Sequence, residues 1–225
     1  MTAARIGAGP DPGPLRPGWV RVDCHLHTVD SGDAWTTLDQ LAERVRQCRL
    51  DVICITDHNV ISAATAAASR QIGCRVIVGE EVRTPSGDVI GLFLTERIPY
   101  VLPLAQVIGQ IRAQGGLVYA PHPFDRGRSS LGAALPPQCA AGLIDVVEVF
   151  NAKICDPAPN QRAAALAAEF GLPGGAGSDA HDPPGIGAAY LEMPGFDGPA
   201  SFLTALHQAT VVGEYRGYAP RYTQS

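Results

Sequence analysis

Short apolar runs rich in Val and Ile alternate along the chain with segments whose apolar residues recur at helical spacing. The strand-like runs cover residues 19–25, 51–56, 75–80, 88–94, 116–120, 144–150 and 172–178. The helical patterns fall between most of these runs, at 37–49, 62–71, 103–114, 160–170 and 199–208. This order is typical of βα units around a mainly parallel sheet. It predicts an α/β fold in which about seven units close into a barrel.

Local signals support the helical segments. Thr37 and Gln40 fit a capping box at the start of the first helix, and Pro103 suits the first turn of the third. We expect Asn160 to cap the helix that follows it and Gly171 to end that helix.

The expected domain organisation is simple. A chain of 225 residues falls within the size range of one compact α/β domain. Residues 1–18 are dense in Gly and Pro and show no apolar periodicity, so we expect a flexible tail there. A single barrel domain is expected over residues 19–215, followed by a C-terminal tail over residues 216–225.

Composition narrows the classes of partner. The net charge of −5 is spread over both signs without a basic run, which argues against binding to long nucleic acid or to an anionic membrane. The six cysteines form no Cys-x-x-Cys pair and resemble small buried hydrophobes of a reducing compartment. No apolar stretch reaches the roughly 18 residues that span a bilayer, and the N-terminus lacks a leader pattern. We therefore expect a cytoplasmic protein.

Five of the six histidines end or follow a predicted strand, namely His25, His27, His58, His122 and His181. Acids share these positions: Glu80 and Glu81, Glu148 and Asp179. Each pattern taken singly has an ordinary structural explanation, such as a capping acid, a rigid Pro-His-Pro turn or a solvated pair of acids. Strand ends of a barrel converge on one mouth, however, and imidazole with carboxylate suits Zn²⁺, Mn²⁺ or Fe ions. His207 lies away from every strand end and is interpreted as a surface or packed residue.

Five motifs occur in order along the chain: "DCHLHT", "ITDHN", "GEEV", "APHP" and "GSDAH". With these motifs at strand ends, the sequence resembles the polymerase and histidinol phosphatase (PHP) domain family. The resemblance covers most of the chain after residue 18. It implies a distorted (β/α)7 TIM-like barrel, two or three divalent metal ions in its mouth, and hydrolysis of phosphate esters.

The resemblance also implies a ligand set, carried over position by position. His25 and His27 would hold one ion with Glu81 and Asp179, and Glu81 would bridge to a second ion held by His122. His58 and His181 would hold a third ion with an acid from the loop after the first strand. Asp33 is our choice for that acid, with Asp30 as the alternative. Glu80 is the alternative to Glu81, which we prefer because an apolar residue follows it.

Several positions stay open at this level. Asp88 stands where the family often has His, and Asp33 replaces a His found in some relatives, so the number of ions remains two or three. Asp57, Asp88 and Glu148 are further candidates, either as ligands or as residues that support the ligands.

The expected activity is that of a metal-dependent phosphoesterase. A metal-bound hydroxide would attack a phosphomonoester of a small metabolite or nucleotide, with Asp179 or His181 assisting proton transfer. Three cations are candidates for binding the phosphate: Arg126 and Arg128 after His122, and Lys153, which is the only lysine. The alternatives are a nuclease or nucleotide phosphodiesterase, a catalytically silent scaffold or regulatory module, and a metal-dependent amidohydrolase.

Overall fold

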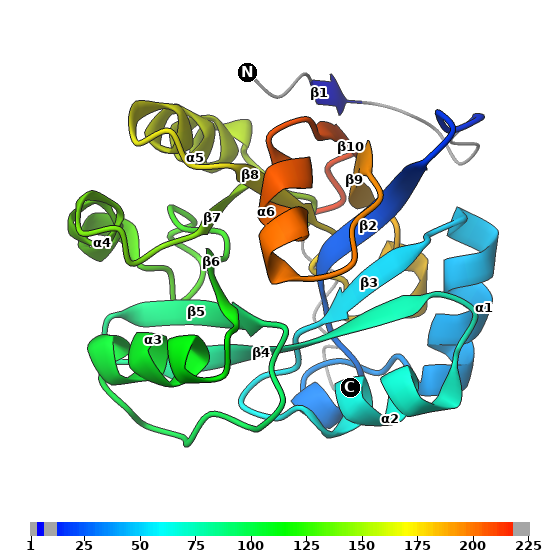
Figure 1. Cartoon of the computed structure of the whole chain (residues 1–225), viewed down its shortest axis with the longest axis horizontal. Coiled ribbons are helices and arrows are strands. Elements are labelled where there is room, and N and C mark those ends of the chain that lie inside the picture. The colour runs from blue at the N-terminus through cyan, green and yellow to red at the C-terminus, as the bar shows by residue number, and fades with distance from the viewer. Residues whose placement is uncertain (1–3, 7–12, 218–225) are drawn as a thin grey trace, which may run out of the picture.

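The computed structural model describes residues 4–6 and 13–217 of the chain. Within these residues the strands form one sheet in the order β1-β10-β9-β2-β3-β4-β5-β6-β7-β8 (Figure 1). The strands are β1 (Ala4–Ile6), β2 (Trp19–Leu26), β3 (Val52–Ile55), β4 (Arg75–Thr84), β5 (Gly87–Leu92), β6 (Leu117–Ala120), β7 (Val146–Asn151), β8 (Gly174–Gly177), β9 (Ala189–Pro194) and β10 (Thr210–Gly213). All seven predicted strand-like runs correspond to strands, β2 to β8.

The sheet curls round until the chain just after β8, the strand at one edge, reaches β2, an inner strand of the same sheet. The residues after β8 pair with the end of β2, where Asp179 donates its backbone N–H to the carbonyl of His25 at 2.7 Å. His27 in turn donates to the carbonyl of Ala180 at 3.0 Å. The buried Asp23 carboxylate reinforces this closure, because its Oδ1 accepts the backbone N–H groups of both His25 and Ser178. The prediction of a distorted α/β barrel is therefore confirmed.

The distortion comes from antiparallel strands. β5 runs antiparallel to β4 and β6, and β9 runs antiparallel to β2 and β10. The pairs β2–β3, β3–β4, β6–β7 and β7–β8 are parallel, as a βα barrel requires. Their C-terminal ends point to one side, which makes a mouth at that side.

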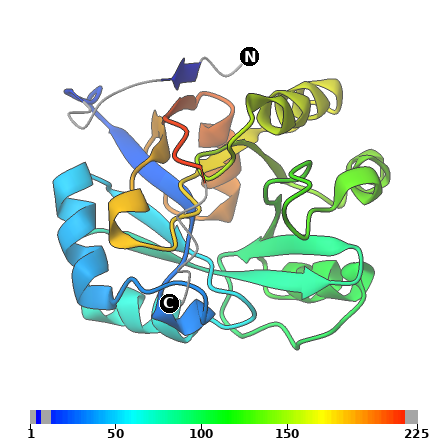
Figure 2. The same ribbon diagram turned by 180° about the vertical axis from the view of Figure 1, so that it is seen from behind.

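Helices cover the outer side of the strands (Figures 1 and 2). They are α1 (Leu38–Cys48), α2 (Ser62–Arg70), α3 (Leu104–Ala113), α4 (Leu135–Ala140), α5 (Pro157–Glu169) and α6 (Pro199–Leu206), with three short 3-10 turns, η1 (Val29–Ser31), η2 (Gly132–Ala134) and η3 (Pro183–Gly185). Helix α2 packs against β3 and β4, α3 against β5 and β6, and α5 against β7. No helix within residues 4–6 and 13–217 is long and apolar enough to cross a membrane.

Most helix signals read from the sequence act as expected. Thr37 and Gln40 form the predicted capping box, and α1 buries Leu41 and Val45. The prediction for Asn160 is wrong, because α5 begins three residues earlier and Asp156 caps it. The Asn160 side chain is buried and instead bonds to the backbone of Asn151, with its Oδ1 accepting at 3.2 Å.

Three strands have no counterpart in the sequence analysis. β1 lies inside the segment expected to be a flexible tail, and pairs in parallel with β10 at the edge of the sheet. β9 and β10 form an antiparallel pair that joins this edge to β2. Such short segments give little periodicity of their own, and their strand conformation depends on the ladder bonds of a neighbour. Residues 1–3, 7–12 and 218–225 of the expected tails lie outside the described residues.

Candidate metal centre

The predicted histidines and acids meet at the mouth of the barrel. Their side chains form four overlapping groups whose ligand atoms all lie within 4.8 Å of one another. The groups are His25–His27–Glu81, His25–His122–Asp179, Glu81–Asp88–His122 and His27–His58–His181. Every histidine that the sequence placed at a strand end belongs to at least one group.

The innermost group centres on Glu81 of β4. The Nε2 atoms of His25 and His27 lie 3.1 Å apart, and each is 3.2 Å from Oε2 of Glu81. The Oδ1 atom of Asp179 is 3.5 Å from Nε2 of His27 and 3.7 Å from Nε2 of His25. All four side chains are buried. Strand alternation explains the first pair, because His25 lies on β2, His27 directly follows that strand, and residues i and i+2 share a face.

The second group lies on the other side of Glu81. Nε2 of His122 is 3.0 Å from Oε1 of Glu81, so the two oxygens of this carboxylate face different histidines. Asp88 of β5 completes the group from the position where the resembled family often has His. Asp88 thus supplies a carboxylate at the position where a second ion would need a ligand.

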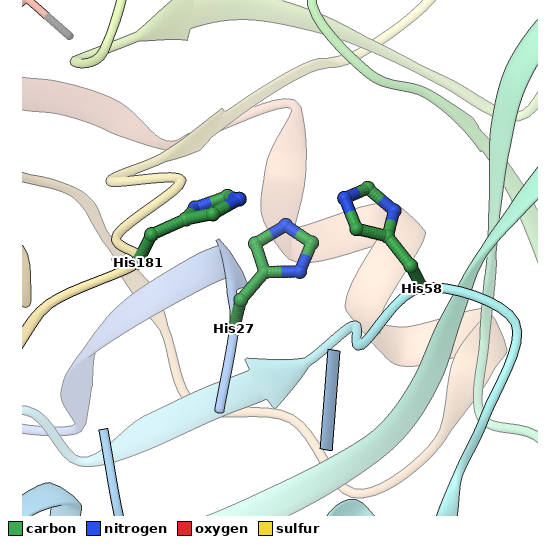
Figure 3. Close-up of side chains that lie close together, drawn as sticks. All are labelled: His27, His58 and His181. Atoms are coloured by element: carbon green, nitrogen blue, oxygen red, sulfur yellow. The ribbon is translucent and has the colours of Figure 1, made fainter. Parts of the chain in front are cut away.

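The third group is nearer to solvent. The rings of His27, His58 and His181 point toward one another from β2 and from the loops after β3 and β8 (Figure 3). Oδ2 of Asp33 lies 3.5 Å from Nε2 of His58 and 3.3 Å from Nε2 of His181. Asp30, the alternative, bonds instead to the hydroxyl of Ser62. The structure therefore brings Asp33 and not Asp30 to these histidines.

Two other candidate acids are placed outside the groups. Both oxygens of Asp57 accept hydrogen bonds from Thr28, one from the backbone N–H at 2.6 Å and one from the hydroxyl at 2.7 Å. Asp57 thus anchors the loop after β2. Glu80 faces away from Glu81, since neighbours on a strand alternate, and its Oε2 accepts the N–H of Ile98 at 2.8 Å. Neither is a member of a group found among the described residues.

The backbone is strained where two of the groups meet. His122 and Asp179 have positive φ values of 27° and 50°, which non-glycine residues adopt at a cost of about 1–3 kcal/mol. Surrounding hydrogen bonds hold both, since the N–H of His122 bonds to Glu148 and that of Asp179 to His25. Such strain commonly occurs at functional sites.

Glycines of β8 make room for the site. A Cβ atom on Gly177 would lie 2.4 Å from Cβ of His25, and one on Gly175 would lie 2.3 Å from Cε2 of Tyr119. Neither distance is compatible with a side chain at these two positions. Within the "GGAG" run, Gly177 therefore permits close approach of the ligand-bearing strand β2, and Gly175 permits close approach of Tyr119 on β6.

The carboxylates create a field that favours positive charge at His25. Burial alone would lower the pKa of His25, but Glu148 and Glu81 outweigh it and raise that pKa to about 9. Burial alone would raise the pKa of Glu81, yet the surrounding histidines hold it well below its usual value. The negative charge that keeps His25 protonated would equally favour a bound divalent cation.

The donor set fits a divalent cation on two further observations. Oδ1 of Asp179 is buried without a hydrogen-bond partner among the described atoms, although it faces the histidines. A buried polar atom without a partner is costly unless something else satisfies it. Two ring nitrogens 3.1 Å apart also need a shared positive charge or a proton between them. Imidazole and carboxylate are ligands of Zn²⁺, Mn²⁺ and Fe.

Two of the three candidate phosphate-binding cations lie at the centre. Arg128 forms an ion pair with Asp179, and Nζ of Lys153 lies 3.7 Å from Oδ1 of the same carboxylate. Nζ of Lys153 is also 3.0 Å from Nδ1 of His181. Burial and then the nearby Arg128 lower the pKa of Lys153 to about 7. Arg126 is exposed to solvent, and no contact joins it to the groups.

Some residues of the site carry no signal in the sequence. The hydroxyl of Ser31 contacts Nδ1 of His27 at 2.8 Å and accepts the backbone N–H of His58 at 3.0 Å. Tyr119 and Asn151 both bond to Glu148, from the interior of β6 and the end of β7. A lone Ser, Tyr or Asn has no periodicity that marks it, so spacing could not have found them.

Comparison with known proteins places this barrel and its site in a family. The family model of the PHP domain matches residues 23–112, and the model of the PHP-associated region matches residues 157–211. MJ0417, an uncharacterized protein of Methanocaldococcus jannaschii, is 34% identical over 197 residues, covering 83% of this chain and 79% of that protein. The chain belongs to the PHP domain family.

Solved structures agree on the fold. A two-domain protein from Bacteroides vulgatus, described as containing a predicted PHP-like metal-dependent phosphoesterase, matches with a TM-score of 0.64 at 18% identity. The match covers 80% of this chain and 60% of that chain. PsfC from Pseudomonas syringae matches with a TM-score of 0.65 at 21% identity, covering 87% and 92%.

Proposed function

We propose that this protein is a metal-dependent phosphoesterase that hydrolyses a phosphomonoester of a small metabolite or nucleotide. The observation that carries the proposal is that candidate metal ligands and candidate phosphate-binding cations both lie against Asp179. Its Oδ1 faces the Nε2 atoms of His25 and His27 and lies 3.7 Å from Nζ of Lys153, whereas its Oδ2 pairs with Arg128. The buried residue Asp179 thus links the candidate metal ligands to the candidate phosphate-binding side chains.

Three ion positions follow from the groups. His25, His27, Glu81 and Asp179 would hold the first ion, and Glu81, Asp88 and His122 the second. His58, His181 and Asp33 would hold the third. Bound divalent ions, whether Mn²⁺, Zn²⁺ or Fe, supply Lewis-acid polarisation of phosphate oxygens and make water a stronger nucleophile near neutral pH.

Two cationic side chains would bind the phosphate and so position the substrate. The guanidinium of Arg128 offers a planar fork of donors that matches phosphate oxygens, and Lys153 adds a compact charge from the loop after β7. Both are paired with Asp179, so engagement of Asp179 by an ion would free them to contact phosphate. With only the first two ion positions filled, His181, which contacts Lys153 and is partly open to solvent, can pass a proton toward the leaving oxygen and regain one from water.

The charge pattern supports a small monoester. Two cations beside the ion positions match a terminal phosphate dianion better than an internal diester, which carries one negative charge. The chain has a net charge of −5 and no basic run that would follow a nucleic-acid backbone. We further infer a reducing compartment such as the cytoplasm, which suits the six cysteines, all free thiols in the structure.

The test combines elemental analysis of the purified protein with hydrolysis of p-nitrophenyl phosphate and of its bis-ester, each with Mn²⁺ or Zn²⁺ added. The proposal expects two or more metal equivalents and faster turnover of the monoester. Faster turnover of the bis-ester would favour the phosphodiesterase alternative. Protein that binds no metal and cleaves neither ester would overturn the proposal in favour of a silent module.

A further inference from the structure

We propose that Glu148 is a positioning residue that orients ligands of two ion positions without binding an ion itself. The inference rests on the proposed metal centre, and it concerns a carboxylate that the sequence left open as ligand or support. Glu148 lies on β7 and is fully buried. It stands behind His25 and His122, on the side away from Glu81.

The Glu148 carboxylate is saturated with donors. Its Oε1 lies 3.0 Å from Nδ1 of His25 and accepts the hydroxyl of Tyr119 at 3.0 Å. Its Oε2 accepts the backbone N–H of His122 at 2.6 Å and the side-chain amide of Asn151 at 2.9 Å. An ionised carboxylate offers about four lone-pair sites, and here four donors use them. No site is left for a cation.

Two of these bonds fix a ligand directly. A proton on Nδ1 of His25 is committed to Glu148, so the Nε2 atom of that ring is the one turned to Glu81 and His27. The bond to the N–H of His122 holds the strained backbone that directs its ring at Glu81. Carboxylate partners of this kind set the tautomer and orientation of metal-binding histidines.

Asn151 extends the same control to Asp179. Its Nδ2 donates to Oε2 of Glu148 at 2.9 Å and to Oδ2 of Asp179 at 3.0 Å. The amide cannot be turned around, because its Oδ1 accepts the backbone N–H of Lys153 at 3.0 Å. Through this amide the Glu148 carboxylate is linked to a third ligand, and Oδ1 of Asp179 is left facing the histidines.

Glu148→Gln tests the proposal with little change in volume. Whichever way the new amide lies, its NH2 group meets two donors, either at His25 and Tyr119 or at His122 and Asn151. We expect the affinity for Zn²⁺, measured by competition with a chelating dye, to fall about 10–100-fold. Glu80→Gln is the matched control, since Glu80 is also a buried acid but faces away from the groups. Its Zn²⁺ affinity should equal that of the parent.

A second readout does not depend on a bound metal. In the ¹⁵N-labelled metal-free parent, Nδ1 of His25 should carry a downfield, slowly exchanging proton, assigned by its loss in His25→Ala. Glu148→Gln should lose this resonance while the remaining spectrum stays folded. If the variant does not fold, the parent spectrum alone still decides, because absence of the Nδ1 proton would overturn the proposal.

The outcomes separate this proposal from the proposed function. A parent that binds Zn²⁺ but cleaves no phosphate ester would overturn the phosphoesterase assignment and leave the role of Glu148 intact. A Glu148→Gln variant that binds Zn²⁺ as tightly as Glu80→Gln does would overturn the role of Glu148 alone.

Discussion

The inner and outer halves of the metal centre are built differently. The inner half consists of His25, His27, His122 and Glu81, whose side chains are at most 2% exposed and which lie on strands or within two residues of a strand end. The outer half contains His58 and Asp33, whose side chains are 21% and 55% exposed and which lie on loops. Glu148 contacts His25 and His122 of the inner half, whereas the outer ligands are held by loop contacts such as the bond from the N–H of His58 to the hydroxyl of Ser31.

If both halves hold ions as proposed, this difference favours separate roles for them. A buried, fully oriented ligand set suits ions that stay with the protein, and an exposed set suits an ion that exchanges or arrives with substrate. Rigid strands place the first set, and loops that follow them place the second. Substitutions in one half at a time test this difference.

The largest effect is expected from removal of the inner pair. His25→Ala with His27→Ala should abolish most metal binding and lower the rate of ester hydrolysis at least ~1000-fold, because several kcal/mol of transition-state stabilisation is lost. Elemental analysis and monoester kinetics measure the two effects. His207→Ala changes the exposed histidine of α6's C-terminal end and serves as control. A double variant with the metal content of the parent would refute the inner ligand set.

The phosphate-binding cations should give the next largest effect. Arg128→Ala removes a charged partner at Asp179, and we expect kcat/KM to fall about 10–100-fold, chiefly through KM. Arg126→Ala, in the same loop but exposed, should have a much smaller effect. Metal content must be measured in both variants, so that a loss of ions is not mistaken for a loss of substrate binding. Equal effects of the two changes would speak against Arg128 as a phosphate ligand.

The closure of the inner half can be tested through stability. Gly177→Ala would place a Cβ atom against His25, and overpacking of this kind costs about 1–3 kcal/mol of unfolding free energy. Gly109→Ala is the matched control on the exposed side of α3, where nothing lies within 4 Å, and it should stabilise by up to ~1 kcal/mol. Chemical denaturation of both variants measures the difference. Similar behaviour of the two would mean that β2 and β8 do not pack as closely as described.

The outer half should respond most mildly. Asp33→Asn removes a charge next to His58 and His181, and we expect the weakest ion to bind about tenfold less tightly while the inner ions remain. Titration of metal-free protein with Mn²⁺ would resolve the sites. Asp30→Asn should leave the titration unchanged, because Asp30 contacts Ser62 instead. A loss of inner ions in Asp33→Asn would show that the two halves are not independent.

Much of the centre could be predicted because a strand fixes both the face on which each side chain lies and the side of the barrel on which the strand ends. Alternation puts His25 and His27 on one face of β2, and parallel strands end on one side of a barrel, so histidines at strand ends had to converge. Alternation also separates Glu80 from Glu81. The prediction failed where a helix start depended on a neighbour, as with Asn160, whose side chain bonds to β7 instead of capping α5.

Local patterns in the chain were therefore enough to predict the barrel, the strand ends and the residue types that meet there. The choice of Asp33 over Asp30, the place of Asp88 beside Glu81 and His122, and the saturation of Glu148 by Tyr119 and Asn151 became visible only in the folded molecule. The two kinds of information differ in how far along the chain they reach. Periodicity is a local property that fixes the face on which a side chain lies, whereas the partner of a loop acid or a buried amide is set by contacts between segments far apart in the chain.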